Sequence, residues 1–311
     1  MDNNFAKTCP ALKIENLTKV YKSGIRAIDN ISFEVAQGSF FALLGQNGAG
    51  KSTTIGIITS LVNKTSGKVS VFGYDLDQHR TKIKQMIGVV PQEFNFGTFE
   101  KTGDIVRNQA GFFGLPPRVA EAKAKETLQR LKLWYRAEHV SRSLSGGMKR
   151  RLMLAKSLVN SPKLLILDEP SAGADVEIRY QIWELLGELS ASGTTIILTT
   201  HYLEEVEKLC DHVAIINAGK IVENTSLQNL LSRLNEQTFL LTIEPSDVLP
   251  TVDSDKYTVQ RLNEQTLEIN ISDIGLLGGA LQELGQKGYK IKNITNKTNR
   301  VEQLYLSITR S

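Results

Sequence analysis

A glycine-rich stretch that begins at Gly45 fits the phosphate-binding loop pattern G-x-x-x-x-G-K-[ST]. It consists of Gly45-Gln46-Asn47-Gly48-Ala49-Gly50-Lys51-Ser52, followed by Thr53. Glycines let the backbone curl so that successive N–H groups point into one concavity, which is a ready site for an anion. Lys51 adds a charge that can reach β- and γ-phosphates, and the Ser52 hydroxyl is placed to bind Mg²⁺.

The residues on either side of this loop support the match. Residues 39–44 are largely apolar and predict a short buried strand, whereas residues 54–62 predict a helix. The N-terminal end of such a helix adds its dipole to a phosphate site. The stretch therefore predicts nucleotide binding rather than a chance glycine-rich turn.

The composition indicates an ordinary globular protein. The 311 residues suffice for one large domain or two, with 41% hydrophobic and 23% charged residues. A net charge of +4 does not argue for nucleic acid, and it fits either a place near an anionic membrane or a solvated surface. Two cysteines, Cys9 and Cys210, do not indicate a disulfide scaffold and fit a reducing cytoplasm.

The N-terminal residues and the apolar runs bear on the location of the chain. Residues 1–10 read as a loose tail, without the cationic lead and apolar core of a signal peptide. No apolar run approaches the length of a membrane span. We therefore expect a cytoplasmic chain, and if it works at a membrane, another chain supplies the spans.

Strand and helix patterns alternate along residues 11–232. Strand patterns cover residues 12–21, 27–35, 39–44, 68–72, 87–90, 163–167, 194–200, 212–217 and 221–222. Helix patterns cover residues 54–62, 81–86, 102–113, 118–133, 177–189 and 202–210, and one that the stretch 144–148 opens and that runs to 159. This alternation predicts an α/β domain whose sheet is mainly parallel and flanked by helices. Residues 93–160 read as a helical insert.

Residues 234–311 follow a different pattern. Strand patterns cover residues 239–243, 257–262, 267–271 and 289–294, and helix patterns cover residues 276–284 and 301–308. Leu267, Ile269 and Ile271 alternate with polar residues, as in a strand with one buried face. We expect a small, separate α+β domain here.

Two more groups of residues carry chemistry. Asp168 follows an apolar strand at its C-terminal end, where ligands bind in open α/β sheets, so it can hold Mg²⁺ opposite Ser52. Glu169 comes next and can act as general base on an attacking water. Ser145-Gly146-Gly147 precedes a helix and makes either a second anion site or an ordinary helix cap.

The order and spacing of these motifs resemble the ATP-binding-cassette (ABC) ATPases. The resemblance rests on Gly45 to Thr53, Gln92, Leu144-Ser145-Gly146-Gly147-Met148, Leu164 to Pro170, Asp175 and His201. Within that superfamily the chain is similar to the ATPase subunits of exporters that pair with ABC-2-type permeases. The resemblance implies the P-loop NTPase fold of the ABC cassette, with a mixed or parallel sheet, flanking helices and a helical insert. It also implies ATP and Mg²⁺ as ligands.

The resemblance also implies a role for each residue of one nucleotide site. Residues 45–53 would hold the phosphates, and Tyr21 would stack on adenine. Gln92 would sense Mg²⁺ and the attacking water. Ser52, Gln92 and Asp168 would serve the metal, and Glu169, His201 and Gln92 would serve hydrolysis.

Other residues would act across a subunit boundary. Ser145, Gly146 and Gly147 would bind the γ-phosphate of ATP held by a second copy of the chain. Asp175 would lie at the boundary and help link the two sites. The resemblance thus implies a head-to-tail dimer and an ABC-2-type permease as partners, with no nucleic acid.

Three features depart from the family pattern or stay open. Met148 stands where the family usually has Gln, and Ala174 stands where a bulkier aliphatic residue is commoner. We expect activity to survive the first change, and the second leaves the tightness of the subunit contact open. Lys149-Arg150-Arg151 reads as a solvated helix face, with a phosphate or partner role as the alternative.

The function that we expect is an ATPase subunit of an exporter, peripheral on the cytoplasmic face of the bacterial inner membrane. A soluble cassette ATPase, an importer ATPase and a non-hydrolysing scaffold are the alternatives. The transported substrate cannot be inferred from fold or family.

Overall fold

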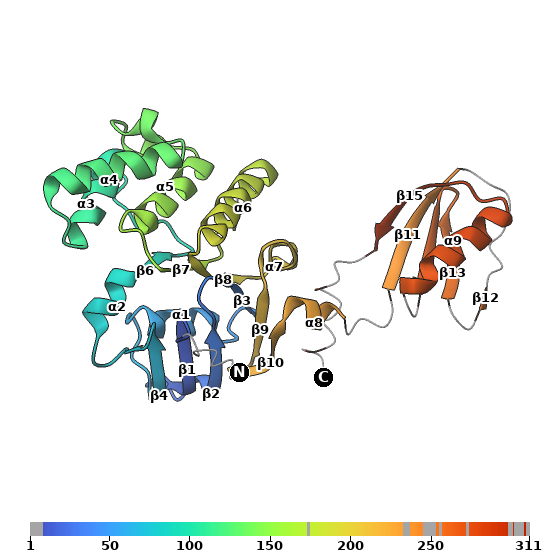
Figure 1. The fold of residues 1–311 in the computed structure, drawn as a ribbon, viewed down its shortest axis with the longest axis horizontal. Coiled ribbons are helices and arrows are strands. Elements are labelled where there is room, and N and C mark those ends of the chain that lie inside the picture. The colour runs from blue at the N-terminus through green and yellow to red at the C-terminus, as the bar shows by residue number, and fades with distance from the viewer. Residues whose placement is uncertain are drawn as a thin grey trace, which may run out of the picture. The chain divides into compact units, whose positions relative to one another are not determined.

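The computed structural model describes residues 9–172, 175–232, 237–244, 253–254, 257–271, 274–297, 301 and 308 (Figure 1). Contacts divide the chain into two units, Met1–Thr225 and Ser226–Ser311. Most of the helix expected over 301–308 lies outside the described residues, as do residues 1–8 of the expected tail.

The first unit begins with an antiparallel sheet. Its strands, in the order β2-β1-β4-β5, are β2 (Arg26–Val35), β1 (Leu12–Val20), β4 (Ser66–Val71) and β5 (Tyr74–Asp75). Strand β1 pairs antiparallel with both β2 and β4. These antiparallel strands agree with the mixed arrangement that the family resemblance implies, whereas the alternation pattern alone predicted a mainly parallel sheet, and β5 was not predicted. The connection from β1 to β2 is too short for the crossover that parallel neighbours need.

A second, six-stranded sheet carries the parallel pattern that the sequence predicts. Its strands, in the order β10-β9-β3-β8-β7-β6, are β10 (Lys220–Ser226), β9 (His212–Asn217), β3 (Phe40–Leu44), β8 (Thr195–Thr200), β7 (Leu164–Asp168) and β6 (Ile87–Val90). All pairs from β9 to β6 are parallel. Strands β3 and β8 are buried along their whole length, because both faces of this sheet are covered, one of them by α1 and the antiparallel sheet.

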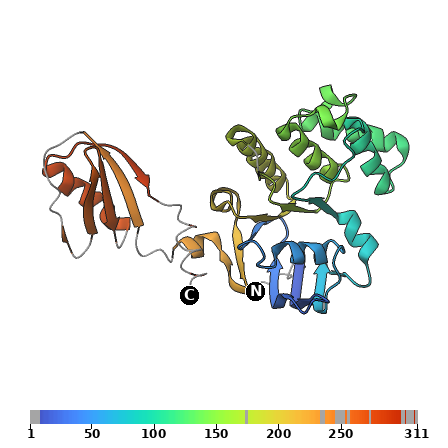
Figure 2. The same cartoon turned by 180° about the vertical axis from the view of Figure 1, so that it is seen from behind.

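Some helices of the first unit lie around this sheet, and others form the expected insert. Those outside the insert are α1 (Lys51–Ile58), α2 (Arg80–Met86), α6 (Val176–Ala191) and α7 (Leu203–Leu209). The insert contains α3 (Thr102–Phe112), α4 (Pro117–Arg130) and α5 (Gly146–Leu158), with 3₁₀ turns at Trp134–Arg136 and Ser141–Ser143. Figures 1 and 2 show the three insert helices grouped on the side of the six-stranded sheet opposite the antiparallel sheet.

Helix α1 starts and ends earlier than the predicted range of 54–62. It begins at Lys51 because Gly50, with φ 115°, turns the phosphate loop directly into the helix. It ends at Ile58 because Ser60 adopts a left-handed backbone, with φ 61°, and the N–H groups of Leu61 and Val62 both donate to the Gly56 carbonyl.

One apolar core joins the two sheets of the first unit through α1. Phe41 of β3, Ile57 of α1 and Ile31 of β2 belong to the same buried cluster, and each is at most 1% exposed. Each such side chain contributes about 1.5–3 kcal/mol when it leaves water. The phosphate loop, which lies between β3 and α1, is thus anchored at both ends.

The second unit has the α+β arrangement that its sequence predicts. After α8 (Leu227–Leu231), its strands in the order β12-β13-β14-β11-β15 are β12 (Asp253–Ser254), β13 (Tyr257–Asn263), β14 (Thr266–Ile271), β11 (Gln237–Ile243) and β15 (Ile291–Asn296). Helix α9 (Leu277–Gln286) packs Ala280 and Leu284 into one cluster with Leu241 and Ile269.

Gly88 of β6 tests how closely the insert packs on the sheet. A Cβ at this position would lie 2.4 Å from the Ser157 carbonyl oxygen of α5, so Gly88→Ala should lower the free energy of unfolding by about 1–3 kcal/mol. Gly187 lies within α6 with nothing near its Cβ position, and Gly187→Ala should instead stabilise by up to about 1 kcal/mol. Urea unfolding followed by circular dichroism measures the unfolding free energy of both variants. Equal changes in the two variants would contradict the close packing of α5 on β6 at Gly88.

Candidate functional site

The glycine-rich loop needs glycine at its two ends because other backbone lies against it. A Cβ on Gly45 would lie 2.4 Å from the Ile216 carbonyl oxygen of β9. A Cβ on Gly50 would lie 2.7 Å from the Ala27 carbonyl oxygen of β2, and Gly50 has a left-handed backbone as well. The loop is therefore clamped between the two sheets of the first unit.

Lys51 folds over this loop. Its Nζ donates to the Gly45 carbonyl at 2.7 Å and to the Gln46 carbonyl at 3.1 Å, and the residue is 5% exposed. Burial lowers the pKa of Lys51, while the carboxylates of Glu169 and Asp168 act in the opposite direction. Because its hydrogen-bond partners are neutral carbonyls, the ammonium charge is available to an anionic ligand.

A hollow of about 150 Å³ lies at the start of α1 and joins the loop to two distant residues. The loop side of the hollow consists of Asn47, Gly48 and Gly50 to Thr53. Gln92, which follows β6, and Glu169, which follows β7, form the rest of its lining. The structure therefore brings together residues from three parts of the chain that the sequence had assigned to one site.

The carboxylates at the end of β7 are held by β8. The Thr199 hydroxyl donates to Asp168 Oδ1, and the Glu169 N–H donates to the Thr199 carbonyl at 2.9 Å. Glu169 is 6% exposed and has φ 50°, a left-handed backbone that a non-glycine residue adopts only when its surroundings enforce it. This turn directs its side chain into the hollow.

Both oxygens of the Glu169 carboxylate have partners. His201 Nδ1 lies 3.0 Å from Oε1, and Gln92 Nε2 donates to Oε2 at 3.3 Å. The three residues predicted to serve hydrolysis thus meet at one carboxylate. His201 itself is exposed, so it lies at the rim.

Tyr21 also lies near the loop. Its hydroxyl is 3.3 Å from Thr53 Oγ1, and the residue is 39% exposed. Lys19 Nζ lies 4.9 Å from the centre of its ring. An exposed ring beside the phosphate loop is free to stack on a flat ligand.

Ser145, Gly146, Gly147 and Asp175 do not line this hollow. Ser145 caps α5 by accepting from the Met148 N–H at 3.3 Å, and Asp175 caps α6 by accepting from the Ile178 N–H at 2.8 Å. Both are exposed. Within one chain they are helix caps, and the Ser145 cap uses the backbone of Met148 and not its side chain. Ala174 lies outside the described residues.

The interpretation of Lys149-Arg150-Arg151 as a solvated helix face is wrong for Arg150. This side chain is 6% exposed and donates to the carbonyls of Gln92 at 3.1 Å and Ala172 at 2.9 Å. Its guanidinium lies 5.2 Å from the centre of the Phe94 ring. Arg150 therefore braces the loop after β6 against the loop after Glu169. A run of three cations gives no sign of which one is buried.

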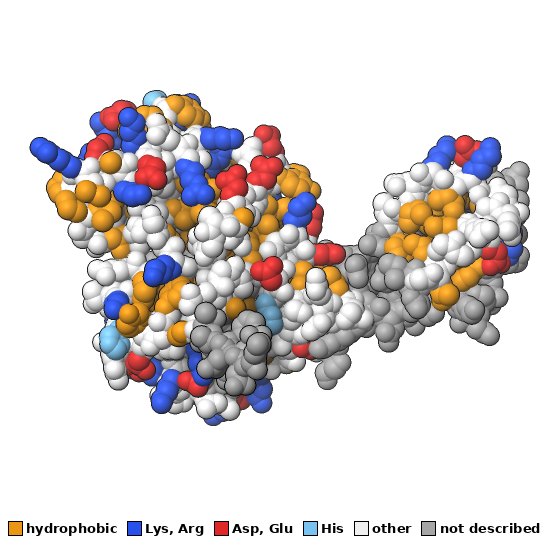
Figure 3. Space-filling model, viewed as in Figure 1, with side chains coloured by type: hydrophobic (Ala, Val, Ile, Leu, Met, Phe, Trp, Pro, Cys, Tyr) orange, Lys and Arg blue, Asp and Glu red, His pale blue; other side chains and the backbone are white. Residues whose placement is uncertain are grey.

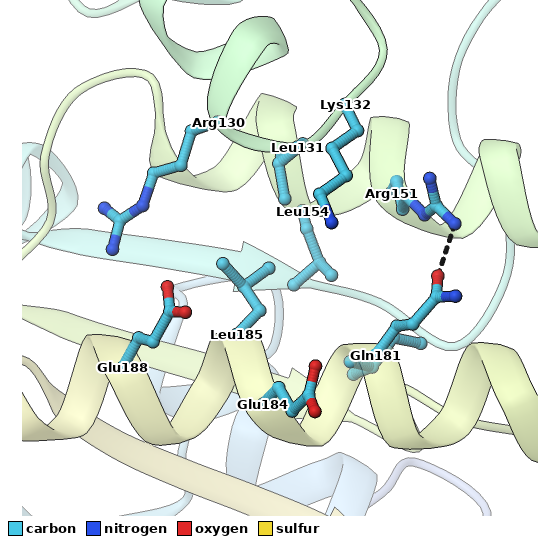
Figure 4. Close-up of a pocket in the computed structure, with 10 residues that line it drawn as sticks. Arg130, Leu131, Lys132, Arg151, Leu154, Gln181, Glu184, Leu185 and Glu188 are labelled. Carbon is cyan, nitrogen blue, oxygen red and sulfur yellow. Dashed lines mark hydrogen bonds between the residues drawn. The ribbon is translucent and has the colours of Figure 1, made fainter.

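Several other hollows lie away from the phosphate loop, and two of them involve the helical insert. One, of about 110 Å³, separates α4 and α5 from α6, with Arg130 and Lys132 facing Glu188 and Glu184 across it (Figure 4). The other, of about 340 Å³, lies between the insert and the sheet, and Leu61, Val89, Pro91, Gln109, Phe113 and Met153 help to line it. Neither includes a predicted phosphate, metal or catalytic residue.

Comparison with known proteins assigns the chain to a family. A family described as ABC transporter matches residues 28–172. Linearmycin resistance ATP-binding protein LnrL of Bacillus subtilis is 40% identical over 230 residues, which are 74% of this chain and 73% of that protein. The chain belongs to the ABC transporter ATP-binding proteins.

Further comparisons agree with this family. Nod factor export ATP-binding protein I of Cupriavidus metallidurans is 39% identical over 209 residues, which are 67% of this chain and 69% of that protein. The ATP-binding cassette MJ0796, in a dimeric post-hydrolysis state with ADP and Pi, has a TM-score of 0.64 and 28% identity, over 70% of this chain and 98% of that one. The predicted family and cassette fold are confirmed, and the chain is an ATP-binding member of the ABC ATPases.

No helix in the described ranges of this ABC ATPase is long and apolar enough to cross a membrane.

Arg150→Met tests whether the buried Arg150 side chain stabilises the two loops that it bonds to. The change leaves two carbonyls, those of Gln92 and Ala172, without their donor, so we expect a loss of about 1–3 kcal/mol in unfolding free energy. The neighbouring Lys149→Met is the control and should stay within about 0.5 kcal/mol of wild type. Equal stability of the two variants in urea unfolding would contradict the buried position.

Proposed function

We propose that this chain is the Mg²⁺-dependent ATPase subunit of an exporter and works as a head-to-tail dimer on an ABC-2-type permease. The observation that carries the proposal is the hollow at the start of α1, in which Gln92 and Glu169 face the phosphate loop. A phosphate group held by the loop would lie against a carboxylate able to take a proton from water.

The nucleotide would bind along the surface from Tyr21 to the loop. Residues 45–53 would hold its phosphates through backbone N–H groups and the N-terminal end of α1. Lys51 would exchange its two carbonyl partners for phosphate oxygens. Tyr21 would stack on the adenine ring, which its exposed position beside Thr53 allows.

The residues around the hollow suit Mg²⁺, a hard cation that prefers oxygen ligands. Ser52 is exposed at the first turn of α1 and presents a hydroxyl. Asp168 uses one carboxylate oxygen for the Thr199 hydroxyl, which leaves the other for the metal, and Gln92 adds an amide oxygen. When bound, Mg²⁺ would neutralise charge that develops on the β- and γ-phosphates.

Hydrolysis would be the attack of water on the γ-phosphate. The water oxygen bonds to phosphorus, its proton passes to Glu169, and the bond to the β-phosphate oxygen breaks to release ADP and phosphate. His201 and Gln92 would keep the Glu169 carboxylate directed at the water through the contacts they already make. The chain thus contributes mainly positioning and charge, as expected for phosphoryl transfer.

A second copy would complete each site. Ser145 and the glycines that open α5 form an exposed helix N-terminus, which favours an anion, yet they do not line the hollow of their own chain. Gly146, Gly147 and Ser145 of one copy would bind the γ-phosphate held by the other, and Asp175 would lie at the boundary. The dimeric MJ0796 cassette is a precedent for such pairing.

Two observations support the proposed export and permease coupling: the names of the relatives and one surface of the first unit. The names of the relatives refer to Nod factor export and linearmycin resistance, which favours export over import for this chain. The 340 Å³ hollow opens beside exposed Leu61, and apolar side chains also gather on the insert around α3 (Figure 3). A permease helix docked there would lie near Pro91 and so act on Gln92, holding the chain at the cytoplasmic face of the inner membrane.

The domain boundaries are also part of the proposal. Residues 11–232 would form the nucleotide-binding cassette with its insert at about 93–160, and residues 234–311 a small α+β domain. The presence of Glu169 and His201 beside the phosphate loop favours an active ATPase over a scaffold.

Glu169→Gln tests the central role. The amide keeps the shape of the side chain but cannot accept the proton, so we expect ATP binding within about twofold of wild type, accumulation of dimer with Mg-ATP, and a loss of turnover of about 10²-fold or more. A nucleotide-binding assay measures ATP affinity, analytical ultracentrifugation measures dimer formation, and phosphate release measures turnover.

Exposed Glu188, on α6, supplies the control: Glu188→Gln should hydrolyse ATP like wild type. Wild-type protein in EDTA gives the metal-free baseline and should be inactive. Near wild-type turnover of Glu169→Gln would remove Glu169 from the general-base role.

Co-purification with the integral membrane protein encoded beside this chain tests the coupling. A stable complex with two copies of each chain and an altered ATPase rate is expected, and Leu61→Ser should weaken it while leaving the ATPase rate of the isolated chain unchanged. Tyr135→Ser, at an exposed position outside the hollow, should not weaken it. An active ATPase that never binds a permease would point to a soluble cassette.

A further inference from the structure

Glu205 on α7 is a buried carboxylate that the proposed mechanism does not use. The residue is 0% exposed. Its Oε1 accepts from the Ser171 hydroxyl and, at 3.2 Å, from the Trp183 indole N–H. Its Oε2 is buried and has no hydrogen-bond partner among the residues that the structure describes. Burying a carboxylate with one oxygen unpaired lowers the stability of the fold. A buried group that costs stability is a candidate for a functional role.

The Ser171 hydroxyl connects Glu205 to the loop that carries Glu169. Ser171 is 0% exposed and lies two residues after Glu169. Between them the chain makes a tight turn, in which the Ala172 N–H donates to the Glu169 carbonyl at 3.1 Å. A displacement of Ser171 is therefore passed to the left-handed backbone of Glu169.

Glu205 itself belongs to the segment that carries His201. It lies four residues after His201 and its N–H donates to the Tyr202 carbonyl at 3.1 Å, in the first turn of α7. The loop after β7 and the segment after β8 thus meet twice. They meet at the rim, where His201 Nδ1 lies 3.0 Å from Glu169 Oε1, and behind it, where Ser171 bonds to Glu205.

A second point of attachment restricts how the two segments move. Where the two segments leave the sheet, the Glu169 N–H already donates to the Thr199 carbonyl, and beyond that point the contact of His201 with Glu169 is exposed to solvent. The bond from Ser171 to Glu205 is buried and shielded from water, and Trp183 of α6 holds the same oxygen. Charge-assisted hydrogen bonds of this kind are the strong ones, which suits a fixed reference point.

We propose that Glu205 is a positioning residue for ATP hydrolysis, acting through Ser171 to hold the Glu169 carboxylate at His201 and in the hollow. This inference rests on the function proposed above for Glu169. Trp183 would anchor Glu205 to the body of the unit without reaching the catalytic loop.

The two donors to Glu205 allow a matched test. Ser171→Ala removes the bond that reaches the Glu169 loop, and Trp183→Phe removes the bond that does not. Each change takes one donor from the same buried oxygen, so a purely structural role predicts similar losses of thermal stability and similar activity. Positioning predicts that only Ser171→Ala lowers kcat.

The measurement is steady-state ATP hydrolysis with ATP binding determined separately. We expect Ser171→Ala to lower kcat about tenfold or more, with ATP affinity within about twofold of wild type, because small misplacements of a catalytic group cost that much. Trp183→Phe should keep kcat within about twofold. Exposed Glu204 adjoins Glu205 on α7, and Glu204→Gln should match wild type.

Glu205→Gln gives a second variant that preserves shape. Its amide oxygen accepts weaker bonds than a carboxylate, so kcat should fall between those of wild type and Ser171→Ala. Wild-type kcat in both Ser171→Ala and Glu205→Gln overturns the inference, and so do equal kcat losses in Ser171→Ala and Trp183→Phe.

Glu169→Gln measured in the same series separates a failure of the proposed ATPase function from a failure of the positioning role. If Glu169→Gln retains turnover, the proposed function fails and the positioning role fails with it. If Glu169→Gln is inactive while Ser171→Ala turns over like wild type, only the positioning role fails.

Discussion

Backbone hydrogen bonds hold β3, β8 and β7 in a parallel ladder, and the register of that ladder places the groups of the candidate site. Leu44 pairs with Thr200, and Asp168 pairs with Thr199. Because parallel strands end at the same edge, the phosphate loop, the carboxylates and His201 all leave the sheet at one level. A shift of one residue in this register would turn the side chains to the opposite face.

Buried polar side chains then connect the segments that leave this edge. Arg150 links the insert to the carbonyls of Gln92 and Ala172, and Glu205 links α7 to Ser171 and Trp183. Burying a charged group is costly and hydrogen bonds offset part of that cost, so each of these groups favours the positions in which its partners bond to it. The loops around Glu169 are thereby tied to the insert, to α6 and to α7.

Much of the fold and of the site could be predicted because local signals and tertiary contacts agree there. The apolar run 163–167 corresponds to the buried parallel strand β7, which begins and ends one residue later. The alternation in 267–271 became a strand that packs against α9. The antiparallel arrangement of β1, β2 and β4 was missed, since strand patterns carry no direction. Arg150 was missed because nothing local distinguishes it from Lys149 and Arg151.

The sequence by itself determined which chemical groups this chain presents and in what order: a phosphate loop, a carboxylate pair after an apolar strand, and a histidine after another. Those features are local, since they depend on residue type and on spacing within a few residues. Only the tertiary structure decided that Gln92, Glu169 and His201 meet at one carboxylate, and that Glu205 is buried behind it. These residues are far apart in the chain, and their meeting depends on strand order, register and packing, which are properties of the whole unit.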